Sequence, residues 1–313
     1  MSHDRYVAFL PAEHRTMIEP VPTWWDWRGR RVHVARAVRP DSAVRLLVLH
    51  GGGGHAGALW PLAALAARDG VEVLVPDMPL YGRTVEPHPG RVRYGDWVDL
   101  VCDLVRHERA DDPRPLVVLG ASMGGMLGYE VAARTGELAH VVVTCLLDPS
   151  DPAARRAAAR TPVLGAVGAP VLRALDPLCG RLRMPVRLMV NMMAMSGDPA
   201  LARLCAGDPL GGGVRAPLGF LASWLNFAHT RPEDFDAAPV TLVHPAADAW
   251  TPPELSTRFL ARLRVPTRTV MLENCGHYPV EQPGVDQLVA TLRAVRDEVT
   301  GQSAVNRSTR SSS

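Results

Sequence analysis

The chain contains no lysine, and arginine supplies all 34 of its basic side chains. The 32 acidic residues nearly balance them, which leaves a formal net charge of +2 at pH 7. The arginines are interleaved with acidic residues instead of forming the basic stripe that a nucleic-acid-binding surface requires. We therefore expect no nucleic-acid partner.

Cysteine is scarce as well, with five widely spaced residues and no C-x-x-C pair. An odd number of cysteines without paired histidines nearby predicts neither a disulfide framework nor a zinc site. No other group of candidate ligands has the spacing of a metal cluster, so we expect neither a metal nor a cofactor.

The chain also lacks long apolar runs. Its first residues, Met1 to Arg5, show no positive region followed by an apolar stretch, which would mark a secretory signal. No uninterrupted run reaches the roughly 18 apolar residues that a bilayer crossing needs. We therefore expect a cytoplasmic protein without a membrane span.

What the sequence does contain is an alternation of short β-branched runs with segments of helical periodicity. The runs are almost continuously apolar, which is typical of parallel strands covered on both faces. The alternation predicts a mostly parallel, doubly wound α/β sheet with right-handed crossovers, preceded by an antiparallel hairpin between Trp24 and Ala37. The expected strands are residues 45–49, 71–75, 116–119, 140–147, 240–244 and 267–272, and the expected helices are residues 59–68, 94–109, 123–134, 253–263 and 285–299.

The alternation stops between residues 150 and 236, where short helical patterns are broken by proline and glycine. We interpret this stretch as an inserted helical lid, rich in methionine, whose apolar side chains pack against the sheet domain or line a pliable pocket. Residues 1–149 and 237–300 would then form the core. The last segment, residues 301–313, is rich in serine and arginine and is expected to be a disordered tail.

The sequence Gly120-Ala121-Ser122-Met123-Gly124 follows an expected strand and precedes an expected helix. A serine at so tight a turn has its hydroxyl lifted clear of the sheet, and a Cβ at the flanking glycines would clash. By itself the pattern also fits a glycine-rich loop with an inert serine. Its interpretation as a nucleophile elbow therefore depends on partners elsewhere in the chain.

One such partner is a run of four glycines, Gly51 to Gly54, directly after the strand expected at residues 45–49. Glycines at this place let backbone N–H groups point toward one position with no side chain in the way, as an oxyanion hole requires. A phosphate-binding turn is the alternative, but no G-K-[ST] sequence follows.

Two further candidates follow expected strands: Asp248 comes after residues 240–244, and His277 comes after residues 267–272. Both should emerge at the edge of the sheet where Ser122 emerges. The chain order Ser122, Asp248, His277 is that of the α/β-hydrolase fold and differs from those of chymotrypsin-like and subtilisin-like enzymes.

The chain resembles serine hydrolases of the α/β-hydrolase fold over nearly all of its length from Trp24 to Val299. The sequences H-G-G-G-G-H-A-G at residues 50–57 and G-A-S-M-G-G at residues 120–125 are similar to motifs of monoacylglycerol lipases and lysophospholipase-like members. The loop at residues 77–84 resembles the D-x-x-G-x-G-x-S loop of these enzymes, with one residue inserted and threonine in place of serine.

The resemblance implies a role for each candidate. Ser122 would attack an acyl carbonyl, His277 would take its proton, and Asp248 would orient the imidazole. Backbone N–H groups of Gly52 and Met123 would bind the oxyanion.

Asp148 is an alternative acid, because it follows the strand expected at residues 140–147 and some members of the fold place the acid after that strand. The commonest arrangement favours Asp248. His50 and Asp77 are expected to brace loops.

We therefore predict a serine hydrolase that cleaves a carboxylic ester of a small or medium hydrophobic acyl substrate through an acyl-enzyme on Ser122. The same residues would also serve a thioesterase, a peptidase or amidase, an acyltransferase or a perhydrolase. A non-catalytic ligand-binding module is a further alternative. The sequence is silent on the oligomeric state.

Overall fold

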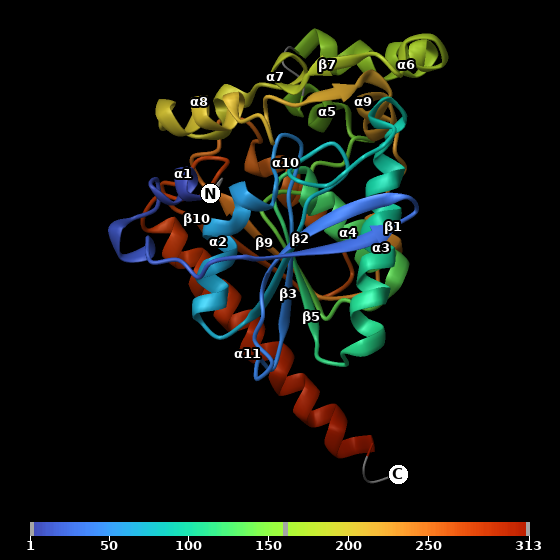
Figure 1. The fold of residues 1–313 in the computed structure, drawn as a ribbon. Helices are drawn as coiled ribbons and strands as arrows, with labels where there is room; N and C mark the ends of the chain where they lie inside the picture. The colour runs from blue at the N-terminus through green and yellow to red at the C-terminus, as the bar shows by residue number, and fades with distance from the viewer. Residues whose placement is uncertain (1–2, 159–161, 311–313) are drawn as a thin grey trace.

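The computed structural model describes residues 3–158 and 162–310 and is built on one eight-stranded sheet (Figure 1). The strands lie in the order β1-β2-β4-β3-β5-β6-β9-β10. The six strands from β4 to β10 in this order are parallel, as the apolar runs predict. The parallel strands are β3 (Arg45–Leu49), β4 (Glu72–Pro76), β5 (Leu116–Gly120), β6 (His140–Val143), β9 (Val240–Pro245) and β10 (Thr267–Leu272).

The predicted hairpin is present as β1 (Val21–Trp27) and β2 (Arg30–Ala37), which pair antiparallel across the turn at Arg28 and Gly29. Strand β2 then pairs antiparallel with β4. The hairpin therefore extends the parallel sheet at one side. Strand β6 is shorter than the expected 140–147, because the chain leaves the sheet after Val143.

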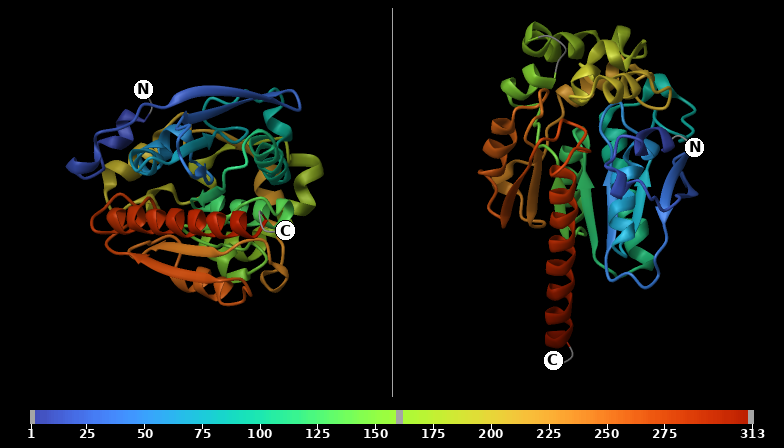
Figure 2. Two further views of the ribbon diagram at one scale, coloured as in Figure 1. Left: turned by 90° about the horizontal axis from the view of Figure 1, so that it is seen from below. Right: turned by 90° about the vertical axis from the view of Figure 1, so that its left-hand side faces the viewer.

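Helices cover both faces of the sheet (Figures 1 and 2). Helices α2 (Ala56–Arg68) and α11 (Gly284–Arg310) contact each other and strands on one face, whereas α3 (Tyr94–Asp111), α4 (Met123–Thr135) and α10 (Pro253–Leu260) form the other layer. The core lies between these layers, and every residue of β3 and β5 is buried. The short helix α1 (Asp4–Val7) and the turn η1 (Ala12–His14) precede the sheet, and η2 (Pro89–Arg91) precedes α3.

The winding direction of the chain reverses between β3 and β5. From β3 the chain goes to β4 on one side, and after α3 it returns to β5 on the other side. In doubly wound sheets, a crevice opens at the carboxyl ends of the two strands where the winding reverses. Here those ends lead directly into the glycine run and into Ser122.

The segment predicted as a lid lies over this carboxyl edge of the sheet (Figure 1, green to yellow at the top). Contrary to the expectation of helices alone, it contains two short paired strands, β7 (Arg183–Pro185) and β8 (Arg215–Pro217). Strands of three residues are too short to show an alternating pattern. Its helices and turns are α5 (Pro152–Ala158), α6 (Pro162–Cys179), α7 (Val186–Met189), η3 (Met192–Met195), α8 (Pro199–Gly207), α9 (Leu218–Leu225) and η4 (Pro232–Asp234).

The carboxyl end of the chain differs from the predicted disordered tail. Helix α11 continues to Arg310, past the predicted boundary at residue 301, and projects beyond the sheet (Figure 2). Once a helix is nucleated and packed, as α11 is through Val285, Leu288 and Val295, each further residue adds a hydrogen bond at low cost. Residues 311–313 lie outside the described part. In the described residues, no helix is both long enough and apolar enough to cross a membrane.

Candidate active site

Ser122 lies at the turn between β5 and α4, in a backbone conformation that few non-glycine residues adopt. Its φ is 55° and its ψ is −125°. The turn is so tight that a Cβ on Gly120 would lie 2.2 Å from the carbonyl oxygen of Gly124, and a Cβ on Gly124 would lie 2.3 Å from that of Leu49. Only glycine fits at both positions, as predicted from the elbow pattern.

A hydrogen bond from outside the motif holds this strained turn. The N–H of Ser122 donates to the hydroxyl of Thr144 at 2.9 Å. Thr144 follows β6, the neighbouring strand, and is buried. The sequence does not mark this residue, because one threonine at the end of an apolar run carries no signal of its own.

The glycine run packs directly against the elbow. A Cβ on Gly51 would lie 2.9 Å from the backbone nitrogen of Met123, and one on Gly52 would lie 3.5 Å from the Met123 side chain. Gly53 has a φ of +82°, which favours glycine. Because Met123 is the first residue of α4, its N–H has no acceptor one turn earlier in the helix. The loop and the helix N-terminus therefore meet beside Ser122.

His50 braces the start of the glycine run, as expected. Its Nδ1 lies 2.8 Å from the carbonyl oxygen of Gly51, and its Nε2 accepts from the N–H of Met78 at 2.9 Å. Burial lowers the pKa of His50 to about 4. Since both ring nitrogens are engaged, His50 is a structural group.

Asp248 and His277 meet at the same edge of the sheet. The His277 Nδ1 lies 2.7 Å from Asp248 Oδ2, and the Asp248 side chain is fully buried. The other Asp248 oxygen accepts from the N–H groups of Trp250 and Thr251, and the Thr251 hydroxyl donates to Oδ2. Burial acts to raise the pKa of Asp248, but the hydrogen bonds from His277 and Thr251 outweigh it and lower the pKa to about 2. The carboxylate is therefore ionised at neutral pH and orients the imidazole.

The remaining ring nitrogen of His277 faces no partner. Its Nε2 is buried and makes no hydrogen bond to any residue in the described part of the chain. His277 and Ser122 line one pocket, together with Gly51 to Gly54. The rest of the lining is mostly apolar. It comes from the sheet, α2, α11, the N-terminal segment, the lid and the loop after β10, through Val48, Leu59, Leu62, Leu119, Leu288, Tyr6, Met195, Cys205 and Tyr278.

The alternative acid, Asp148, makes other contacts. Its carboxylate accepts from the N–H and the hydroxyl of Ser150, and it lines a separate pocket with Arg258 and Arg262. Asp77 braces loops, as expected, because it contacts the His33 ring at 2.8 Å and accepts from the N–H of Arg83 at 2.8 Å. Of the acids considered, Asp248 is the one that contacts His277.

One group of possible metal ligands occurs in the described residues, away from the pocket. Single ligand atoms of His3, Asp4 and Glu19 lie within 4.8 Å of one another. The two carboxylates are exposed, and each lies 3.3 Å from His3 Nε2.

Comparison with known proteins places this geometry in a family. The sequence profile of the Alpha/beta hydrolase family matches residues 46–288, which include the glycine run, the elbow, Asp248 and His277. The chain belongs to this family of hydrolases. A relative of shorter match, the uncharacterized protein YfhR of Salmonella typhimurium strain LT2, is 33% identical to the hydrolase over 88 residues. That match spans 28% of the hydrolase and 30% of the relative's length.

Solved structures share the fold of the hydrolase at low sequence identity. A soluble variant of monoglyceride lipase from Saccharomyces cerevisiae has a TM-score of 0.70 at 16% identity, covering 92% of this chain and 99% of its own. The monoacylglycerol lipase of Paleococcus ferrophilus has a TM-score of 0.64 at 19% identity, with 91% and 99% covered. A thioesterase domain from the curacin biosynthetic pathway has a TM-score of 0.59 at 17% identity, with 89% and 99% covered. Lipases and a thioesterase thus share the fold, which leaves the substrate open.

Proposed function

We propose that this hydrolase cleaves carboxylic esters of small or medium hydrophobic acyl groups through an acyl-enzyme on Ser122. One observation carries the proposal: a buried carboxylate holds the His277 ring at Nδ1, its Nε2 makes no hydrogen bond among the described residues, and His277 lines the same pocket as Ser122. A base oriented in this way beside a serine hydroxyl is the arrangement that nucleophilic acyl transfer needs.

In the first half of the reaction, the Ser122 oxygen attacks the acyl carbonyl carbon and His277 Nε2 takes the serine proton. The carbonyl π electrons move onto oxygen, which gives a tetrahedral oxyanion. Asp248 stabilises the imidazolium that forms, because its pKa of about 2 keeps it ionised. When the intermediate collapses, the bond to the alcohol breaks and His277 returns the proton to the leaving oxygen.

Backbone N–H groups of Gly52 and Met123 are proposed to bind the oxyanion. The close approach of Gly51 and Gly52 to Met123 supports this assignment. Donors fixed in advance at this position stabilise charge as it develops, and one such donor is worth about 100-fold to 1,000-fold in turnover. In the second half, water attacks the acyl-enzyme with His277 as the base, and Ser122 leaves with a proton from His277.

The lining of the pocket supports an apolar acyl group as the substrate. The wall of the pocket includes many aliphatic side chains, among them Val48, Leu62 and Leu288. No acidic or basic side chain other than the histidines lines it among the described residues. Burial of apolar surface, about 25 cal/mol for each Å², would bind the acyl chain.

Labelling with a fluorophosphonate probe tests the proposal. We expect the wild-type protein to be labelled, and the folded Ser122→Ala variant to be neither labelled nor able to hydrolyse short p-nitrophenyl esters. A Ser122→Ala protein with wild-type hydrolysis would contradict the proposal. A wild-type protein that binds esters without labelling or turnover would point to a non-catalytic ligand-binding module.

A thioesterase is the second candidate, because the curacin thioesterase domain shares this fold over 89% of the chain. Matched panels of esters, thioesters and amides with the same acyl group separate the two. We expect the largest kcat/KM for the esters, and a thioester preference beyond the intrinsic reactivity of thioesters would favour the second candidate.

A further inference from the structure

A buried side-chain contact connects the lid to the segment that follows the glycine run. Asp208, in the lid between α8 and β8, places its Oδ2 3.2 Å from His55 Nε2. The same oxygen accepts from the Tyr6 hydroxyl at 2.8 Å, and Oδ1 accepts from the N–H of Leu210 at 2.9 Å. The side chains of Asp208 and His55 are each 2% exposed. The predicted mechanism uses neither residue.

The contacts of His55 define its tautomer. His55 caps the N-terminus of α2, and its Nδ1 accepts from the N–H of Gly57 at 3.1 Å. An accepting Nδ1 carries no hydrogen, so Nε2 carries it and donates to Asp208. Burial acts to raise the pKa of Asp208, but the bonds from His55 and Leu210 lower it to about 2. The carboxylate is thus ionised and favours the tautomer that caps α2.

The lid also touches the glycine run itself. A Cβ on Gly211 would lie 2.5 Å from the carbonyl oxygen of Gly53, and a Cβ on Gly53 would lie 2.8 Å from the Met192 side chain. The carbonyl of Leu210 accepts from the N–H of Gly82, in the loop after β4. The lid residues around Asp208 are therefore packed onto the core, and some of them contact the glycine run directly.

Four consecutive glycines have no conformational preference that would keep Gly52 in one place. The run is held by the packing of Gly51 and Gly53 described above and also at its two ends: His50 fixes the start, and His55 fixes the end through the cap on α2. His55 in turn is held by Asp208. Loosening this end would let the backbone donor at Gly52 sample positions that do not face the oxyanion.

We propose that Asp208 is a positioning residue, contributed by the lid, that holds the oxyanion-binding glycine run in place through His55. The inference rests on the proposed function and adds a residue to it. It makes the lid a part of the catalytic apparatus as well as a cover for the pocket. In this role Asp208 acts through His55 and touches no reacting atom.

Two variants, Asp208→Asn and His55→Asn, separate the contact between Asp208 and His55 from the cap on α2. Asparagine at position 208 cannot reproduce the contacts of Asp208, because Oδ1 and Oδ2 both accept hydrogen bonds and the amide nitrogen would face a donor at either place. His55→Asn keeps a capping side chain at the N-terminus of α2, since asparagine is among the best N-caps, but cannot reproduce the Nε2 contact with Asp208. Both variants should therefore lose the connection, and His55→Asn should keep the helix end.

We expect Asp208→Asn and His55→Asn each to lower kcat and kcat/KM for a p-nitrophenyl ester by about tenfold, with KM within about twofold of wild type. Equal losses in kcat and kcat/KM indicate an interaction made in the transition state. The inhibition constant of a trifluoromethyl ketone, which forms a tetrahedral oxyanion adduct with a serine, should rise by the same factor. The double variant should be no slower than the slower single variant, because both substitutions remove the contact between Asp208 and His55.

Asp198→Asn is the matched control. Asp198 is another lid aspartate, and it caps α8 through the N–H of Ala200, a role that asparagine fills equally well. It should leave kcat and inhibitor binding unchanged.

Folded His55→Asn protein with wild-type kcat and inhibitor affinity would overturn the inference. So would a loss confined to thermal stability in both variants. If wild-type protein is not labelled by a fluorophosphonate, the proposed function fails first. If wild-type protein is labelled but the variants keep the wild-type kcat and inhibitor affinity, the proposed function stands and this inference alone fails.

Discussion

At the scale of single residues, the site depends on groups that fix a few backbone positions. Ser122 has a positive φ, and a strained non-glycine residue costs on the order of 1–3 kcal/mol. The bond from its N–H to Thr144 and the fit of Gly120 and Gly124 offset this cost. Contacts at the carboxyl ends of two neighbouring strands, β5 and β6, therefore stabilise the strained backbone of Ser122.

The acid offers the sharpest test at this scale. We expect Asp248→Asn to lower kcat by about 10³-fold to 10⁴-fold with the fold retained, because an amide facing His277 Nδ1 favours the wrong tautomer. Asp148→Asn is the matched control, since its carboxylate contacts Ser150, and its kcat should stay within about twofold of wild type. Steady-state ester hydrolysis with circular dichroism checks both. The opposite ranking would make Asp148 the acid.

Ser122 and His277 could be proposed from the sequence because they stand in a contiguous motif or shortly after an expected strand. Thr144, Thr251 and Asp208 could not. Their roles arise from contacts between segments far apart in the chain, and a single threonine or aspartate has no spacing by which to recognise it. Such supporting residues become visible only when the fold brings the segments together.

At the scale of elements, the parallel strands were predictable because burial on both faces leaves almost continuous apolar runs. The paired strands β7 and β8 were not, because three residues give no period. The position of the lid over the site was not predictable either. It depends on contacts between distant segments, such as the hydrogen bond from Tyr278 N–H to the Met195 carbonyl, and not on any local pattern.

Helix α2 supplies part of the apolar wall of the pocket, which leads to a prediction on the length of the acyl chain that the substrate carries. Leu62 lines the pocket and Leu65, on the same helix, does not; they are 5% and 3% exposed. Each change to alanine should cost about 2–5 kcal/mol of stability. Only Leu62→Ala enlarges the pocket, so it should raise the ratio of kcat/KM for octanoyl over acetyl esters by about tenfold, a size typical of differences in apolar pockets. An equal change in Leu65→Ala would contradict this assignment.

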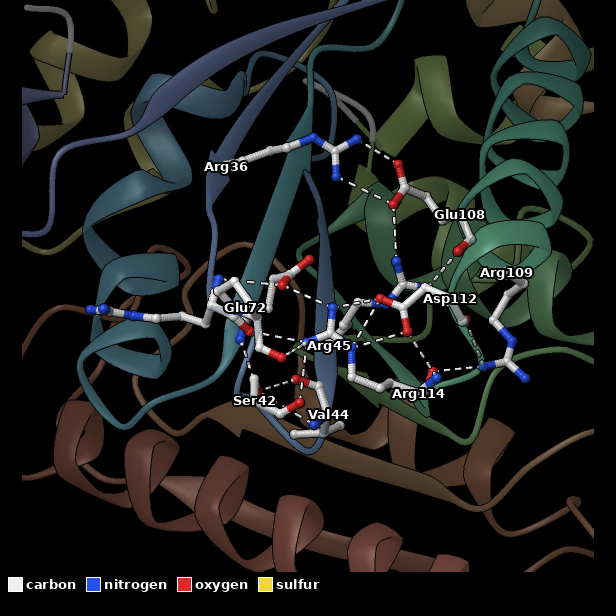
Figure 3. A network of polar contacts seen from close by, with 11 residues as sticks. Arg36, Ser42, Val44, Arg45, Glu72, Glu108, Arg109, Asp112 and Arg114 are labelled. Atoms are coloured by element: carbon white, nitrogen blue, oxygen red, sulfur yellow. Dashed lines mark hydrogen bonds and ion pairs between the residues drawn. The ribbon is translucent and has the colours of Figure 1, made fainter.

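The opposite edge of the sheet is held by an ion-pair network around Arg45, the first residue of β3 (Figure 3). Its guanidinium lies 3.1 Å from Glu108 and 3.3 Å from Asp112, both near the end of α3. The side chain of Arg45 is 2% exposed and that of Glu108 is 9% exposed. Arg36 and Arg114 extend the network to β2 and β4. Three strands and a helix are thus connected at the edge away from Ser122.

Removing the central cation should be costly, because it leaves the largely buried Glu108 carboxylate and the partly buried Asp112 carboxylate with one partner fewer. We expect Arg45→Ala to lower the free energy of unfolding by about 3–5 kcal/mol. Arg106→Ala, which removes an exposed pair with Asp103 at 3.1 Å, should lower it by about 0.5 kcal/mol or less. Urea unfolding measures both, and the kcat of the folded fraction should be the same in each. A small loss in Arg45→Ala would show that the remaining arginines satisfy Glu108.

At the scale of the whole molecule, stability should depend on pH through histidines that fold into the interior uncharged. His50 and His140 are 0% and 4% exposed, and burial lowers the pKa of each from 6.5 to about 4. Between these two values, the unfolded chain binds more protons than the folded protein at both residues. The free energy of unfolding therefore rises with pH across this window and falls as the pH drops from 6.5 toward 4.

His140 allows this dependence to be tested away from the candidate site, because its ring lies at the amino end of β6 and contacts the Thr241 hydroxyl at 2.9 Å. One proton corresponds to about 1.4 kcal/mol for each pH unit. His140→Gln should therefore reduce the slope of unfolding free energy against pH near pH 5 by about that amount, measured by urea unfolding from pH 7 to 4.5. His88→Gln is the control, because His88 is exposed in the folded protein as in the unfolded chain. Parallel curves for His140→Gln and wild type would mean that His140 takes up its proton without unfolding.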